Sequence, residues 1–154
     1  MTIYLFALLI GIVAGLRAMT APAMVSWAAN FGWLDLRGTW LAFFGNVWTR
    51  WILTVFALGE LITDQLPSTP SRTIPVQFAA RIATGALSGA AVGAGSGAIV
   101  GGLIAGIFGA IIGTLGGREF RARLAKAFGS DRPAALVEDA VAIIGALLIG
   151  GALR

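Results

Sequence analysis

The feature that most constrains the fold is an uninterrupted run without a charged residue, from Ile82 to Gly117. As a single α-helix this run would be ~54 Å long at about 1.5 Å per residue. The apolar core of a bilayer is only about 30 Å thick, so the run is too long for one membrane crossing. The glycine-dense segment 93–97 offers a break. The run therefore predicts two antiparallel helices joined by a tight turn.

The overall composition argues against a water-soluble globule. Of the 154 residues, 58% are hydrophobic and 12% are charged, and the mean hydropathy is +0.89. Soluble domains carry about 25% charged residues, and disordered chains are far less apolar than this one. The sequence has no cysteine and no histidine, which excludes disulfides, thiolate or histidine catalysis and most zinc or haem sites. We therefore expect one transmembrane domain over residues 1–154, with no cofactor, no metal site and no enzymatic activity.

Further apolar windows predict about five membrane crossings in all. A crossing takes roughly 20 helical residues, and the remaining windows near that length are residues 1–16, 47–64 and 133–153. Together with the two helices of the long run, the first of which is expected to begin near Pro75, these windows predict an all-α integral membrane fold.

The first crossing is expected to be broken. Arg17 follows it directly and Pro22 lies five residues later. Proline removes a backbone donor and clashes with the preceding turn, so the helix should kink or restart here, with Thr20 as the cap and residues 21–31 as a shorter second piece. If the two pieces instead form a full hairpin, the chain crosses six times and the N-terminus moves to the other side.

The basic residues predict the orientation in the membrane. One group follows the second and fourth crossings: Arg72, Arg118, Arg121, Arg123, Lys126 and Arg132. The other side has only Arg37, Arg50 and Arg154. By the positive-inside rule, segments 65–75 and 118–132 are cytoplasmic, and the N-terminus is inside for five crossings. All five tryptophans lie between residues 27 and 51, which predicts an interfacial stretch on the opposite side, with Arg50 as an anchor.

The partners that these charges predict are membrane lipids. The net charge of +4 comes from basic residues that cluster where anionic headgroups lie. Lipid contact and orientation explain them without nucleic acid, which we do not expect as a partner.

Glycines predict close helix packing within the long run. Twelve of the 22 glycines lie between residues 85 and 117, and many recur every fourth residue, on one helix face. The expected packing positions are Gly85, Gly89, Gly93, Gly97, Gly101, Gly109 and Gly113. Such faces let two backbones approach closely. They are interpreted either as a glycine zipper between the third and fourth crossings or as a subunit interface. A homo-oligomer is expected, because a chain this small encloses little volume alone.

Several charged residues fall in or next to the predicted crossings. Glu60 and Asp64 are one helical turn apart and would repel each other without a cation between them. Arg72 and Arg81 are the nearest candidates, because the proline-containing loop 66–70 can fold back toward both acids. The other members of the group are Arg17, Thr20, Glu138 and Asp139.

Two interpretations of this group stay open. Ionisable groups inside a membrane are costly and tend to face each other or a polar cavity. The charges either lock the helices together near the cytoplasmic leaflet, or they line a pocket for an ion, a proton or a small solute. In the second case Glu60 and Asp139 are the candidate proton-titrating groups, and Arg17, Arg72 and Arg81 bind an anion or balance charge.

The charged motifs also resemble those of a known family. The strings are GLRAMTAPA (15–23), LGELITDQLP (58–67), PSRT (70–73), RIATGALSGA (81–90) and VEDA (137–140). Together they are similar to a family of small bacterial multi-pass proteins catalogued as domain of unknown function forty-one twenty-six. One departure is Gln65, where we would expect a lysine. The resemblance implies an inner-membrane protein but supplies no activity.

The function expected from the sequence is that of a small multi-pass transporter or channel. It would move a small solute or ion, either passively or with proton coupling. The alternative is a non-transporting membrane scaffold or lipid-interacting assembly protein, in which the charges only hold helices together.

Overall fold

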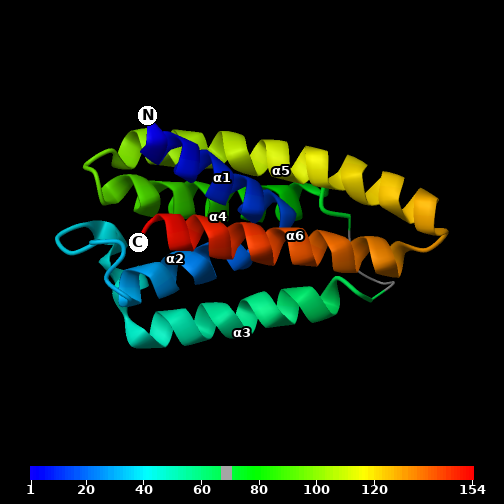
Figure 1. Ribbon diagram of the computed structural model, residues 1–154, viewed down its shortest axis with the longest axis horizontal. Helices are drawn as coiled ribbons and strands as arrows, with labels where there is room; N and C mark the ends of the chain where they lie inside the picture. Colours follow the sequence, from blue (N-terminus) through cyan, green and yellow to red (C-terminus); the bar gives the residue numbers. More distant parts are fainter. Residues whose placement is uncertain (67–70) are drawn as a thin grey trace.

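The computed structural model describes residues 1–66 and 71–154, and this part of the chain forms helices and no strand (Figure 1). The helices are α1 (Thr2–Leu16), α2 (Thr20–Asn30), the 3₁₀ helix η1 (Trp40–Gly45), α3 (Val47–Thr63), α4 (Pro75–Ala94), α5 (Ile99–Phe128) and α6 (Asp131–Ala152). Within the described residues, α5 and α6 are long and apolar enough to span a membrane, and α1 is apolar but shorter. The predicted loop 66–70 lies, apart from Leu66, outside the described residues.

The six α-helices alternate in direction. α1 runs beside α5 in the same sense, because Gly101 faces Tyr4 and Gly113 faces Ile12. α6 returns along α1, and α2 runs beside α6, so that α1 and α2 form an antiparallel hairpin (Figure 1). Both chain termini consequently lie at the same end of the bundle. This is the arrangement that a full hairpin between the first two pieces requires, rather than one kinked helix.

Glycines bring three helices into backbone contact. A Cβ atom placed on Gly89 of α4 would lie 2.8 Å from the Cα atom of Gly106 on α5. A Cβ atom on Gly11 of α1 would lie 2.9 Å from the same Cα atom. Since no real side chain tolerates such distances, α5 can pack this closely against both neighbours only through glycine.

The glycine ladder therefore divides between two neighbours. Gly85, Gly89 and Gly93 face α5 from α4, within the helix pair that the spacing indicated. Gly109 and Gly113 pack against α1 instead of α4, and Gly101 faces the ring of Tyr4. Gly97 lies in the turn between α4 and α5, with φ of +70°, where no atom would touch an added Cβ. The reason is that α1 inserts beside both long-run helices, which the spacing within one segment does not reveal.

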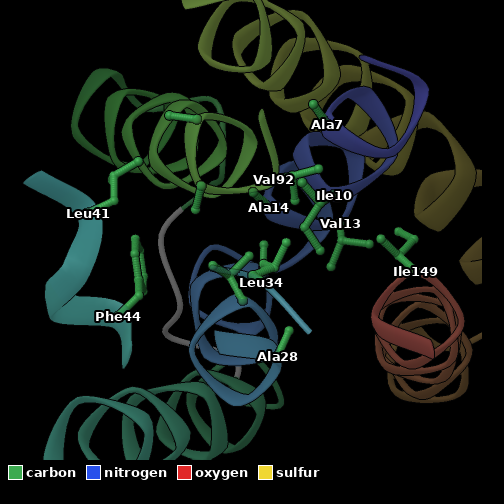
Figure 2. Packing of buried hydrophobic residues seen from close by; sticks show 14 of the residues in the cluster. Ala7, Ile10, Val13, Ala14, Ala28, Leu34, Leu41, Phe44, Val92 and Ile149 are labelled. Atoms are coloured by element: carbon green, nitrogen blue, oxygen red, sulfur yellow. The ribbon is translucent and has the colours of Figure 1, made fainter. Parts of the chain in front are cut away.

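The interior holds small and charged side chains, while large apolar side chains lie outside. Arg17 is the largest fully buried side chain in the described part of the chain, and Phe44, Ile10 and Leu41 come next in size. These three belong to the buried apolar cluster (Figure 2). α3 buries only Ala57, and Val55 and Ile62 on it are 65% and 68% exposed. This distribution is the reverse of that in a water-soluble bundle.

Candidate functional site

The break between α1 and α2 is held by charges from other helices. α1 ends at Leu16 inside the bundle, which leaves its last carbonyl groups without helical partners. Arg81 of α4 donates Nη1 to the carbonyl oxygens of Gly15 and Leu16, at 2.8 and 2.7 Å. A cation at a helix C-terminus also interacts favourably with the helix dipole. Arg81 therefore caps α1.

Glu60 of α3 caps the start of α2 in the complementary way. Its two carboxylate oxygens accept hydrogen bonds from the backbone N–H groups of Ala18 and Met19, each at 2.8 Å. An acid at a helix N-terminus complements the positive end of the dipole. Glu60 also lies 3.7 Å from Arg81. The prediction that Thr20 caps α2 is wrong. No side chain at the start of α2 makes a capping hydrogen bond, and Glu60 of α3 accepts the backbone N–H groups there instead.

Arg17 lies at the tip of the hairpin and joins two acids from different helices. Its Nη1 pairs with Asp64 at the end of α3, and its Nη2 pairs with Asp139 of α6. Glu138 lies 3.8 Å away. Asp139 also accepts a hydrogen bond from the side-chain amide of Gln65, at 3.0 Å. Arg17 is fully buried, so these acids provide the charge balance that bulk water cannot.

Arg72 pairs with Glu138 and not with Glu60 or Asp64, which corrects the pairing expected from the loop. Both guanidinium nitrogens engage the carboxylate, Nη2 at 2.8 Å from Oε2. Arg72 and Glu138 are 8% and 0% exposed. Such two-point contacts are the strongest type of ion pair in proteins.

Arg121 completes the cluster from α5. Its Nη1 lies 3.9 Å from Asp64 and 3.6 Å from Glu138. Its Nε and Nη2 donate to Asp131 at the exposed start of α6, at 2.9 and 2.5 Å. These hydrogen bonds hold the pKa of Asp131 below its usual value. Arg121 was expected only as one of the cytoplasmic basic residues. Its role in the cluster was missed, although it continues the four-residue spacing of Gly113 and Gly117 on the same face.

We call these eight residues the buried charge cluster. Its members come from the α1–α2 link, α3, α4, α5, α6 and the segment before α4: Arg17, Arg72, Arg81, Arg121, Glu60, Asp64, Glu138 and Asp139. Four arginines face four carboxylates, so the cluster is formally neutral. The structure thus brings together all the charged residues that the sequence analysis singled out.

A small hollow reaches the cluster from the side. It has a volume of about 260 Å³ between α1, α5 and α6 and is lined mainly by apolar side chains and glycines, among them Leu16, Gly117 and Phe120. Glu138 is the charged residue in its lining. The hollow is large enough for a few water molecules or a small solute.

Glu60→Gln is expected to destabilise the protein by about 1–3 kcal/mol. The amide would turn one N–H₂ group toward a backbone N–H donor and would remove the charge that faces Arg81. The midpoint of thermal unfolding in detergent measures this effect. Glu119→Gln is the matched control, because Glu119 pairs only at the exposed end of α5, with Arg123 at 2.8 Å. Equal midpoints for the two variants would contradict the capping role.

These features define an all-helical bundle with two helices of membrane-spanning length and apolarity, built around a neutral cluster of buried charges. The chain belongs to the family described as Domain of unknown function (DUF4126), which matches residues 4–150. The match confirms the family resemblance of the charged motifs. No curated protein and no solved structure matches the chain. Since the family description names no activity, the function is argued from the site.

Proposed function

We propose that the protein is a multi-pass membrane transporter that moves a small anion coupled to protonation of the buried charge cluster. In this proposal α3, α4, α5 and α6 cross the bilayer. α1 and α2 form a hairpin that enters from the outer face and turns at the cluster. Both termini are outside, and the cytoplasmic end carries the basic residues of segments 71–75 and 118–132, in agreement with the positive-inside rule.

The outward-facing apolar side chains support the membrane location. Val100, Ile104, Phe108 and Ile112 form an exposed stripe along α5 at four-residue spacing, each at least 48% exposed. In water such a surface would aggregate, whereas lipid covers it at no cost. The buried ions then lie about 10 Å inside the start of α4 and α6, at about 1.5 Å per residue.

The observation that carries the transport proposal is the interrupted helix pair whose ends meet at buried ions. Non-helical backbone at membrane depth is tolerated where protein buries it or where it lines a polar cavity. Transporters use such discontinuous helices to build a site for substrate and coupling ion. Here the Arg17–Met19 link has this position. α3 and α6 supply its partners, and Arg81 of α4 binds the end of α1 just before it.

Neutrality of the cluster suggests how protonation and anion binding would be coupled. Asp139 faces Arg17 through Oδ1 and Gln65 through Oδ2. Protonation of Asp139 would leave the cluster with one excess positive charge, centred on Arg17. A small anion would restore neutrality, and the hollow beside Glu138 offers space for it. In this proposal Glu60 is a structural cap, and Asp139 is the proton carrier.

Asp139→Asn tests the proposal in proteoliposomes that contain a pH-sensitive dye. The probes are chloride, nitrate, acetate and inorganic phosphate, each added with an imposed pH gradient. For at least one of them we expect wild-type flux above that of empty vesicles. We expect Asp139→Asn to keep its fold. Its flux should be at least about tenfold lower than that of the wild type, because asparagine cannot carry the proton.

Asp131→Asn is the matched control for this experiment, because Asp131 pairs with Arg121 outside the spanning segments and its side chain is 64% exposed. It should transport like the wild type. Unchanged flux in Asp139→Asn, or no wild-type flux with any probe, would contradict the transport proposal.

A second candidate is a non-transporting scaffold, which the complete pairing of the cluster favours. All four carboxylates have a cationic partner within 4.0 Å. Such a cluster would lock the hairpin to α3, α4 and α6 without any solute. In this case Asp139→Asn would lower the unfolding temperature, and the wild type would show no flux.

A further inference from the structure

Arg50 is a cation without an acidic partner at the tryptophan-rich end of the bundle. Its guanidinium carbon lies 4.7 Å from the centre of the Trp27 ring and 5.8 Å from that of Trp51. Among the described residues no carboxylate lies within 4.0 Å of it, and its Nε is buried without a hydrogen-bond partner. The two rings hold the guanidinium in place, but the side chain lacks an anion.

An apolar groove begins next to this arginine. It has a volume of about 220 Å³ between α2, α3 and α6. Its lining is mainly apolar and includes Trp27, Thr54, Leu61 and Leu147. Trp27, whose ring contacts Arg50, also belongs to the groove and donates Nε1 to Thr54, at 3.0 Å. Thr54 is one turn beyond Arg50 on α3, so cation and groove are continuous.

The order of charged and apolar groups along α3 matches the order of phosphate and acyl chain in a phospholipid. The groove extends from Thr54 to Leu61, about 10 Å at about 1.5 Å per residue. It leads from the tryptophans, which favour the headgroup level, toward the middle of the bundle. A guanidinium binds a phosphate oxygen pair in two-point geometry, and the apolar groove beyond it suits an acyl chain.

We propose that this groove binds one anionic phospholipid of the outer leaflet, with its phosphate on Arg50 and one acyl chain between α3 and α6. An anionic lipid is favoured over a zwitterionic one, because the guanidinium has no acidic neighbour to receive a cationic headgroup. The proposal rests on the membrane location of the proposed function and not on transport. Lipid binding in detergent is therefore a separate test from flux.

Native mass spectrometry of the purified protein in a neutral detergent measures this binding. The probes are dioleoylphosphatidylglycerol and dioleoylphosphatidylcholine. The wild type should retain one phosphatidylglycerol, with at least about tenfold preference over phosphatidylcholine. Arg50→Gln should lower its affinity for phosphatidylglycerol at least about tenfold. Arg154→Gln, at an exposed arginine on the same end of the bundle, should bind like the wild type.

A second pair of variants tests the groove itself and keeps the proposal falsifiable if Arg50→Gln fails to fold. Leu147 lines the groove and Leu148 does not, and the two are 60% and 69% exposed. Leu147→Trp should fill the groove mouth and lower lipid retention at least about tenfold, and Leu148→Trp should not. Equal retention in both tryptophan variants would overturn the proposal. So would wild-type retention in a folded Arg50→Gln variant, equal binding of both lipids, or full competition by inorganic phosphate.

Discussion

Replacing Arg17 with glutamine is expected to destabilise the folded protein by about 3–5 kcal/mol, as the removal of one partner from a buried ion pair does. Arg17 is the cation between Asp64 and Asp139 at the hairpin tip. Without it, Asp139 faces a neutral amide and Asp64 keeps Arg121, 3.9 Å away, while both carboxylate side chains are only 12% exposed to solvent. The midpoint of thermal unfolding in detergent should fall by about 10 °C or more.

The matched control for this variant is Arg37→Gln. Arg37 also pairs with an aspartate, Asp35, but its side chain is 92% exposed in the loop before η1. Its loss should therefore change the unfolding midpoint little. Removing the charges of the two acids that Arg17 joins from the Arg17→Gln background, with Asp64→Asn and Asp139→Asn, should recover part of the lost stability. If Arg17→Gln unfolds at the same temperature as Arg37→Gln, the buried charge cluster does not hold the bundle together.

Gly106→Ala is also expected to destabilise the folded protein, for a different reason. The added methyl group would lie 3.0 Å from the carbonyl carbon of Gly85 and 3.0 Å from the Cα atom of Gly89. Both are backbone atoms, which cannot rotate away, so α4 and α5 must separate along their contact. Overpacking of this kind costs about 1–3 kcal/mol and more where the backbone must move.

Gly116→Ala is the matched control on the same helix, since no atom lies within 4 Å of an added Cβ there. It should stabilise the protein slightly, by up to about 1 kcal/mol, because alanine favours the helix more than glycine does. Thermal unfolding of the two variants in the same detergent compares them directly. A midpoint for Gly106→Ala within one or two degrees of Gly116→Ala would contradict the close contact between α4 and α5.

Residue types alone predicted seven of the eight members of the buried charge cluster, all but Arg121, but not most of its pairings. An arginine or a carboxylate in an apolar segment needs a partner, which is why Arg17, Glu60, Arg81 and Asp139 could be singled out without a structure. The choice of partner depends on which helix ends lie at the same height in the bundle. Arg72 was thus expected to pair with Glu60 or Asp64 of α3, and it pairs with Glu138 of α6 instead.

Gln65 and Arg121 show what local spacing leaves out. Gln65 drew notice only as a departure from the family pattern, yet it donates to Asp139 across 74 positions of the chain. Arg121 was grouped with the basic residues of the cytoplasmic segment 118–132, because basic neighbours surround it. α5 continues past the glycine ladder and directs Arg121 toward α6 and the end of α3. Both contacts arise only when distant helices are packed together.

The family, the helical class, the break near Arg17 and the kinds of buried side chain could all be predicted without a structure. These follow from local causes: backbone restriction by proline and glycine, helix length, and the cost of an unpaired charge away from water. Three other features required the packed fold: the hairpin of α1 and α2, the contact of α1 with the glycine face of α5, and the capping of the break by Arg81 and Glu60. Each of these depends on contacts between segments far apart in the chain, where burial and shape, rather than spacing along one helix, select the partner.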